Sequence, residues 1–182
     1  MKKLLQRGFT LIELLIVIGI LGILVVAVLL TLNPAEAQRK TRDAKRIKDL
    51  GTIQTVLDQY IAGGGAAVSG SWDSSAGTTN CNGTGWIGLG AGNSLCQYIG
   101  SLPLDPSNNQ TRSVANPGAA CPNTTTANLV AVYRVAMSAG GEYEVDVVQE
   151  ATSNCRNVRD DGGSSNQRAE AGNDAGLDLL GN

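Results

Sequence analysis

The feature that most constrains this chain is an uncharged apolar segment near its N-terminus. No charged residue occurs from Leu14 to Leu32, and with Phe9–Ile12 the run approaches the roughly 20 residues that a helix needs to span the hydrocarbon core of a bilayer. Three basic residues precede it, Lys2, Lys3 and Arg7. Because basic residues stay in the cytoplasm, they predict a cytoplasmic N-terminus, a spanning helix over residues 9–32 and an external remainder.

The candidate cleavage site lies on the N-terminal side of this apolar segment, which is unusual. A secretory signal peptide has a shorter apolar region, with the cleavage site after it. Here the candidate site, Gly8-Phe9, precedes the apolar run. Cleavage would therefore remove a leader of residues 1–8 and leave the helix on the mature chain.

The Lys-rich leader followed by Gly8-Phe-Thr-Leu-Ile-Glu13 resembles the class III leader of type IV pilins and type II secretion pseudopilins. The likeness is close across Gly8–Gly22 and continues in kind to about Ile61. It implies that a prepilin peptidase cuts after Gly8 and methylates the new amino group of Phe9. It also implies an α+β, pilin-like fold, in which a long N-terminal helix packs its second half on a small antiparallel β-sheet.

Glu13 stands just inside the apolar run. A carboxylate in a membrane helix costs several kcal/mol unless it is paired or protonated. After cleavage, the nearest mobile cation is the Phe9 ammonium, about 6 Å away along the same helix or on a neighbouring one. We expect Glu13 to pair with the Phe9 amine of a neighbouring stem and to set the assembly register, a role similar to the one this family gives the residue. The alternative is an interfacial glutamate without a partner.

Two further positions affect the course of the helix. Gly19 and Gly22 fit either close packing or local melting of bundled stems, or the ordinary tolerance of glycine in membrane helices. Pro34 either kinks the helix or restarts it, with Asn33 as the N-cap.

Residues 33–62 are predicted to form an amphipathic helix that ends at Gly63-Gly64-Gly65. Its basic residues face either the membrane surface and neighbouring subunits or the solvent. Its apolar stripe, expected to pack on a sheet, consists of Ala37, Ala44, Ile47, Leu50, Ile53, Leu57, Tyr60 and Ile61.

The outer domain, residues 63–182, is predicted as a loop region 63–128, a β-hairpin 129–148 and a C-terminal loop 149–182. The hairpin joins strands over 129–137 and 142–148. The second strand alternates, so one face should be buried and the other exposed. The residues predicted to be buried are Tyr143, Val145 and Val147, and those predicted to be exposed are Glu142, Glu144 and Asp146.

The four cysteines have no CxxC spacing, and the chain contains no His to complete a mixed zinc site. Two disulfides in an oxidising compartment are therefore expected, with unrelated thiols as the alternative. Of the three possible pairings we favour Cys81–Cys96 with Cys121–Cys155. Trp72 and Trp86 are predicted as core anchors, with a sugar-binding platform as the alternative.

Two segments resemble parts of the major pseudopilins. Leu102-Pro-Leu-Asp-Pro106 is similar to their Leu-Pro-x-Asp-Pro element, also found in several minimal pilins, but Ser107-Asn-Asn109 stands where Trp-Gly usually follows. The Asp/Gly-rich tail is similar to the loop that carries calcium in those proteins. It implies a Ca²⁺ site, although EF-hand spacing is absent and solvated turns are the alternative. The candidate ligands are Asp160, Asp161 and Asp174.

These features favour a structural subunit over an enzyme or a nucleic-acid binder. Nucleophilic triads commonly need a His, and the chain has none, so we predict no catalytic residues and no required cofactor. The net charge is −2, and removal of three basic residues with the leader leaves 11 basic and 16 acidic residues, or −5. That balance gives no electrostatic footprint for DNA.

The resemblance implies a major type IV pilin that serves in adhesion, motility or DNA uptake-type roles. It would be a single-pass protein of the inner membrane before assembly by the membrane machinery, and part of an extracellular homopolymer afterwards. The alternatives are the major pseudopilin of a type II secretion system and a minor tip pilin or adhesin.

Overall fold

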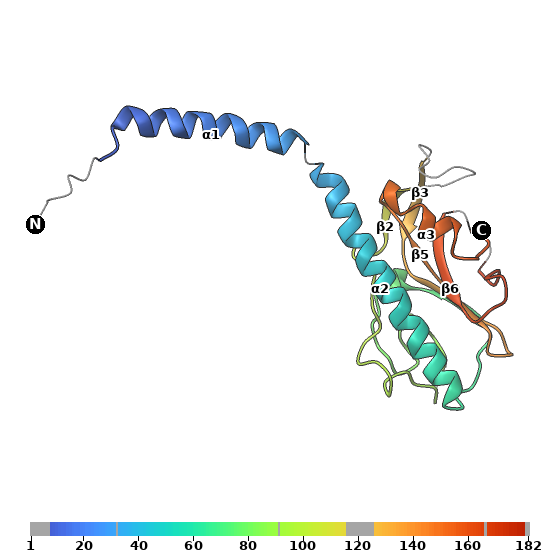
Figure 1. Cartoon of the computed structure of the whole chain (residues 1–182). Helices are drawn as coiled ribbons and strands as arrows, with labels where there is room; N and C mark the ends of the chain where they lie inside the picture. The colour runs from blue at the N-terminus through green and yellow to red at the C-terminus, as the bar shows by residue number, and fades with distance from the viewer. Residues whose placement is uncertain (1–7, 32, 91, 116–125, 166, 181–182) are drawn as a thin grey trace, which may run out of the picture. The chain divides into compact units, whose positions relative to one another are not determined.

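The computed structural model describes residues 8–31, 33–90, 92–115, 126–165 and 167–180 (Figure 1). The chain divides into two compact units, Met1–Ala37 and Gln38–Asn182. The first unit holds helix α1 (Leu11–Thr31) and the start of helix α2 (Pro34–Ala62). The second unit holds the rest of α2 and every strand among the described residues.

The helix restarts at Asn33-Pro34. The Asn33 side chain accepts a hydrogen bond from Glu36 N at 3.2 Å, and its carbonyl accepts one from Ala37 N at 3.1 Å. This is N-cap geometry, and Pro34 at the first helical position lacks only an N–H that the helix does not use there. Of the two alternatives for Pro34, the restart describes the structure.

The second unit is built on an antiparallel four-stranded sheet with the strand order β1-β4-β5-β6. Its strands are β1 (Gly70–Asp73), β4 (Arg134–Met137), β5 (Tyr143–Val148) and β6 (Arg168–Gly172). Strands β2 (Gln110–Ala115) and β3 (Thr126–Ala131) form a separate hairpin. Three short helices complete the described elements: η1 (Ser74–Ala76), η2 (Thr152–Asn154) and α3 (Arg156–Arg159).

Two sequence predictions about the strands were wrong. The region 63–128, predicted as loop, contains β1 and β2, and β1 has only four residues and pairs with a strand more than sixty positions away. The strand predicted over 129–137 is two strands, because β3 pairs with β2 and β4 pairs with β5. Alternation along a chain does not reveal a change of pairing partner. The β4–β5 hairpin itself lies where the sequence placed it.

Helix α2 packs along one face of the four-stranded sheet (Figure 1). Its buried Leu50, Ile53 and Leu57 join the sheet residues Val135 and Val145 in one core. Hydrogen bonds supplement this packing: the Tyr133 hydroxyl donates to Asp49 at 2.7 Å, and the Tyr143 hydroxyl donates to the Gln54 carbonyl at 3.1 Å. Helix α2 is therefore held against the sheet by apolar burial and by hydrogen bonds from the hydroxyl groups of Tyr133 and Tyr143.

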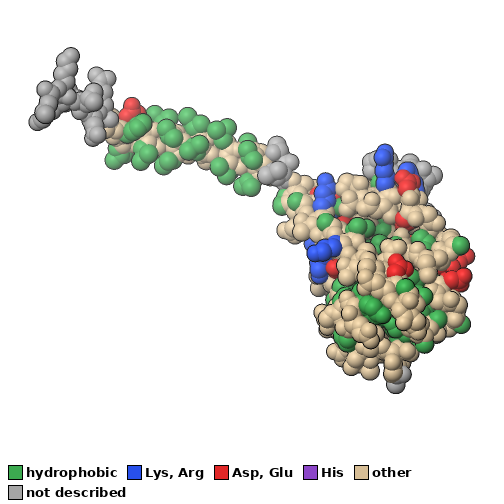
Figure 2. Space-filling model, turned by 60° about the horizontal axis from the view of Figure 1, so that its bottom comes forward, with side chains coloured by type: hydrophobic (Ala, Val, Ile, Leu, Met, Phe, Trp, Pro, Cys, Tyr) green, Lys and Arg blue, Asp and Glu red, His purple; other side chains and the backbone are tan. Residues whose placement is uncertain are grey.

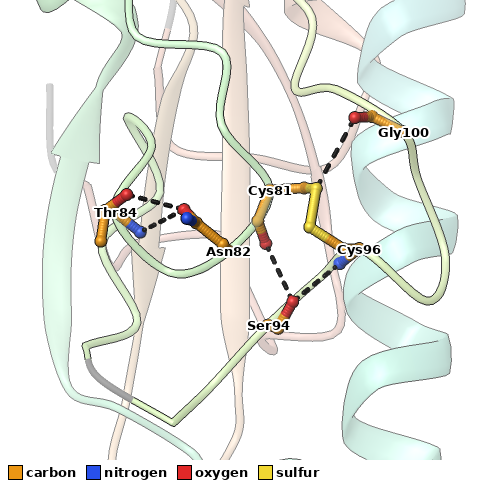
Figure 3. Close-up of a disulfide and its surroundings, with 6 residues drawn as sticks. All are labelled: Cys81, Asn82, Thr84, Ser94, Cys96 and Gly100. Carbon is orange, nitrogen blue, oxygen red and sulfur yellow. Dashed lines mark hydrogen bonds between the residues drawn. A yellow bond between two sulfur atoms is a disulfide. The ribbon is translucent and has the colours of Figure 1, made fainter.

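The loop after β1 is anchored by one disulfide and one tryptophan. Cys81 and Cys96 form a disulfide, and the Ser94 hydroxyl between them donates to the Cys81 carbonyl at 3.4 Å (Figure 3). A bridge across a loop of about 15 residues contributes roughly 3 kcal/mol in the chain-entropy model. Trp86 is buried, and its indole donates to the Pro103 carbonyl at 3.0 Å. It is thus a core anchor.

The structure tests the prediction for Trp72 but not the predicted pairing of Cys121 with Cys155. Cys121 lies outside the described residues, so the pairing of Cys121 with Cys155 stays a prediction. Trp72 is partly buried and packs against the main core. Both tryptophans therefore contact the core.

The N-terminal half of α2 departs from the predicted stripe. The stripe holds from Leu50 onward, but in the preceding turns the fully buried residues are Asp43 and Arg46, while Ile47 is 37% exposed. A charged pair replaces the apolar pair that the spacing predicted. Periodicity failed here because the surface that meets this part of the helix carries carboxylates.

Arg46 joins three segments of the folded unit. Its guanidinium donates to Asp105 at 2.6 and 2.9 Å and to Asp43 at 2.9 Å, and it pairs with Glu150 at 2.7 Å. Asp43 in turn accepts hydrogen bonds from the backbone amides of Glu150 and Ala151. Burial opposes the charge on Arg46, but the hydrogen bonds that it donates to Asp105 and Glu150 outweigh burial and raise its pKa. We call these residues, together with Arg42, the Arg46 cluster.

Substitution of Arg46 by Ala should destabilise the folded unit by about 3–5 kcal/mol, because three buried carboxylates lose a shared partner. The measurement is urea unfolding of the detergent-solubilised full chain, followed by the fluorescence of Trp72 and Trp86. Lys45→Ala is the matched control, since the Lys45 side chain is 54% exposed, and it should change stability by no more than about 0.5 kcal/mol. Equal losses in the two variants would contradict a structural role for the cluster.

Acid should weaken the same cluster. Burial favours the neutral form of Glu150, yet hydrogen bonds from Arg42 and Arg46 lower its pKa below the usual 4.5. An acid with a depressed folded pKa adds stability above its unfolded pKa and loses it as the pH falls through the folded value. The urea midpoint of the wild type should therefore fall as the pH drops below about 4.5.

Glu150→Gln should lower the urea midpoint at neutral pH and flatten this acid dependence. The matched control is Glu142→Gln, which neutralises an exposed glutamate of the β4–β5 turn and should keep the wild-type slope. An unchanged slope in Glu150→Gln would show that another carboxylate causes the acid loss.

Candidate functional site

The segment Gly8–Glu13 ends in a reciprocal cap on α1. Thr10 N and Thr10 Oγ1 both donate to Glu13 Oε2, at 2.8 and 2.7 Å, and Glu13 N donates to Thr10 Oγ1 at 3.3 Å. This is a capping box, in which the side chains of two residues three apart satisfy each other's backbone amides. It explains why the helix begins at Leu11, immediately after Thr10.

Sequence reasoning missed Thr10 as a site residue, although the signal was present. A Thr-x-x-Glu pattern before an apolar run is a signature of a helix start. Glu13 was interpreted only through the free-energy cost of a carboxylate in a membrane helix, so its hydrogen bonds at the helix start were not predicted. In the single chain Glu13 is a helix-capping carboxylate, and its expected pairing with a neighbouring Phe9 amine stays a prediction.

Helix α1 exposes apolar side chains along its length, as the face drawn in Figure 2 shows. Sixteen large apolar side chains between Phe9 and Leu29 are 48–87% exposed. By length and composition, Leu11–Leu29 can cross a membrane. Nineteen helical residues extend roughly 28 Å, close to the roughly 30 Å hydrocarbon thickness of a bilayer. Nothing in the first unit covers this surface among the described residues.

The glycines of this region leave open space around them. A Cβ added at Gly8, Gly19 or Gly22 would meet no other atom within 4 Å. Their lack of a side chain is therefore not required by any described contact within this chain. Close packing against a neighbouring stem and simple tolerance of glycine both remain consistent with this geometry.

The tail aspartates predicted to bind calcium each have a local partner. Asp160 accepts from Arg159 Nε at 2.6 Å, and Asp174 accepts from the Asp178 amide at 3.0 Å. Asp161 accepts from the amides of Gly163 and Glu170 at 3.1 and 2.9 Å. These bonds are those of turns and loop closures, and calcium binding by this set stays a prediction.

The structure instead brings together carboxylates that were predicted to be exposed. Glu144 and Asp146 are completely buried, which corrects the prediction that this face of β5 is open to solvent; Glu142 is exposed as expected. Alternation placed the two residues opposite Tyr143 and Val145 correctly. It gave no sign that the side chains of Arg134 and Arg168 and the backbone of Leu180 contact the second face as well.

Comparison with known proteins bears on the N-terminal segment. A family model described as the prokaryotic N-terminal methylation motif matches residues 3–29. Comparison with curated proteins gave no match, and comparison with solved structures gave none. The match covers the leader, Gly8-Phe9, the capping box and almost all of α1.

The chain therefore carries the class III leader of the type IV pilins and pseudopilins. Together with a helix followed by a small antiparallel sheet, the motif supports a pilin-like or pseudopilin subunit, which is a structural class of protein. It implies processing by a prepilin peptidase and assembly into a pilus-type filament. The leader and the apolar helix fit a precursor anchored in the inner membrane.

The mature N-terminus offers a direct check. When the chain is produced in a host that contains a prepilin peptidase, mass spectrometry should find an N-terminal peptide that begins at methylated Phe9. Gly8→Val should leave the leader attached, because a branched side chain would block the peptidase at the cleaved bond. The control Gly22→Val lies beyond this bond and should be cleaved normally. Recovery of intact Met1 from the wild type would contradict the assignment of the leader.

Proposed function

We propose that this chain is the major subunit of a type IV pilus. A prepilin peptidase removes residues 1–8 and methylates Phe9, and the mature subunit then leaves the inner membrane to join an extracellular homopolymer. In this polymer α1 forms the filament core, and the folded unit that follows forms the surface. The chemistry of the protein is association, and it carries out no catalysis.

The observation that carries this proposal is the all-round apolar surface of α1. Each large apolar side chain left in water forgoes about 1.5–3 kcal/mol of transfer free energy, so sixteen of them cannot be exposed to solvent for long. The helix can leave a bilayer only into another apolar environment. A bundle of identical stems supplies one, which makes polymerisation the natural destination of the mature subunit.

Glu13 supports directional assembly within such a bundle. Among the described residues, both hydrogen bonds from Thr10 fall on Oε2 of this carboxylate, which leaves Oε1 available to a neighbour. In the mature chain an ammonium group at Phe9 needs an anion when it enters the apolar core. Pairing this ammonium with Glu13 of an adjacent stem neutralises both charges and fixes the axial stagger of the two stems.

A second candidate is the major pseudopilin of a type II secretion system. The specific observation in its favour is the Leu102–Pro106 element, whose Asp105 binds Arg46 at 2.6 Å. That contact supports the element as an anchor of the fold, and the element occurs in both classes. The disulfide-closed loop at Cys81–Cys96 favours the surface subunit of a long filament. We therefore rank the pilus first.

Sheared fibres test the choice between them. If the chain is a major pilin, cells that express it at native level should release extracellular fibres in which this chain is the most abundant protein by mass spectrometry. Fibres seen only on overexpression would favour the pseudopilin. A trace amount of this chain in fibres made of another subunit would indicate a minor tip subunit.

Glu13→Ala should abolish fibres or reduce their yield at least tenfold, because the Phe9 ammonium would enter the stem bundle without an anion. The measurement is the amount of chain in the sheared fraction relative to the membrane fraction. Glu142→Ala removes an exposed glutamate of the folded unit and is the matched control, with a fibre yield near that of the wild type. Normal fibres from Glu13→Ala would refute the pairing without refuting the pilus.

A further inference from the structure

Three carboxylates meet on the face of the sheet opposite α2. Glu144 and Asp146 project from β5 on the side away from Tyr143 and Val145, and Glu170 of β6 is paired in register with Asp146. One oxygen from each of the three lies within 4.8 Å of the others. Glu144 and Asp146 are 0% exposed and Glu170 is 3% exposed. We call these three residues the sheet-face triad.

The neighbouring arginines, Arg134 and Arg168, form ion pairs with only one member of the triad, Asp146. Arg134 lies opposite Asp146 in the β4–β5 register and binds its carboxylate, and Arg168 donates to the same carboxylate at 3.2 Å. Arg168 also donates to the carbonyls of Val132 and Val130. Within the described ranges, Glu144 and Glu170 form no ion pair with either arginine.

Glu144 and Glu170 share the same pattern of incomplete pairing. Oε2 of Glu144 accepts from the Leu180 amide at 2.9 Å, and Oε2 of Glu170 accepts from the Ser165 amide at 2.9 Å. The other oxygen, Oε1, is buried in both residues and has no hydrogen-bond partner among the described residues. A buried carboxylate oxygen without a donor is costly, and here two occur in one cluster.

The loop before β6 wraps closely around Glu170, since a Cβ on Gly163 would lie 1.8 Å from Glu170 Oε2. The loop therefore fixes the position of this carboxylate.

We propose that Glu144 and Glu170 bind a calcium ion through their Oε1 atoms. Carboxylate oxygens select a hard cation. Ligands of Ca²⁺ lie at about 2.3–2.6 Å, so two oxygens on opposite sides of the ion are up to about 5 Å apart. One oxygen from each member of the triad lies within 4.8 Å of the others, a spacing that Ca²⁺ can bridge. Mg²⁺ demands a near-ideal octahedron and keeps its water ligands, so it should bind a buried carboxylate pair less well. Water molecules supply the remaining ligands.

The site has a structural consequence. Through the amides of Ser165 and Leu180, the bound ion would tie the loop before β6 and the end of the described chain to the sheet. This site differs from the Asp160, Asp161 and Asp174 set that the sequence suggested, and it does not depend on the filament proposal.

Calcium binding to the detergent-solubilised full chain tests the inference. After treatment with EDTA and removal of the chelator, isothermal titration calorimetry with CaCl₂ should show one site. A hundredfold excess of Ca²⁺ over its dissociation constant should raise Tm by roughly 5–10 °C, and MgCl₂ should raise it less. Absence of Ca²⁺ binding by the wild type would overturn the proposal and leave the pair bridged by a proton.

Charge-neutral variants locate the ion. Glu170→Gln and Glu144→Gln keep the size of each side chain and should each weaken Ca²⁺ binding at least tenfold. Glu142→Gln on the same hairpin and Asp174→Asn in the tail should bind like the wild type. Normal binding by both triad variants, or loss of binding in Asp174→Asn, would place the ion elsewhere and refute the sheet-face site. Should a variant not fold, the wild-type titration still decides whether an ion binds.

Discussion

The folded unit depends on one buried guanidinium. Arg46 lies at the point where α2, the Leu102–Pro106 element and the end of β5 come together, and it binds carboxylates from each segment. Buried ion pairs add little net stability compared with apolar packing, but they tolerate few alternative arrangements. Asp43 extends the same constraint to the backbone of Glu150 and Ala151. The Arg46 cluster therefore fixes the angle and register of α2 on the sheet, which apolar burial alone would leave adjustable.

The two units place opposite requirements on their surroundings. The folded unit buries polar groups and must give each of them a partner. The stem has almost no polar groups, and its requirement is an apolar environment on every side. Thr10 and Glu13 cap the start of α1 from within the stem.

Local patterns predicted the stem well and the outer unit only in part. The apolar run and the break in the helix at Asn33-Pro34 depend on residues close together in the chain, and the sequence placed both, although it left open whether Pro34 kinks or restarts the helix. Strand β1 and the burial of Arg46 depend on partners roughly sixty residues away. Glu144 and Asp146 were placed on the correct face of β5, but the groups that meet them there are the arginines of the neighbouring strands and Leu180 of the tail. Periodicity reports which residues share a face, and tertiary structure decides whether the face is buried.

One physical rule applies to all the buried carboxylates described above and indicates which of them would bind an ion. A carboxylate removed from water keeps its charge only next to donors or a cation. Asp43, Asp105 and Glu150 have Arg46, and Asp146 has Arg134 and Arg168. Glu13 has Thr10, and in the filament we propose it would also have the Phe9 ammonium of a neighbour. Glu144 and Glu170 each have one amide and one unpartnered oxygen. Since Glu144 and Glu170 each keep one buried oxygen without a partner, this pair is the place where an ion from solution has the most to stabilise.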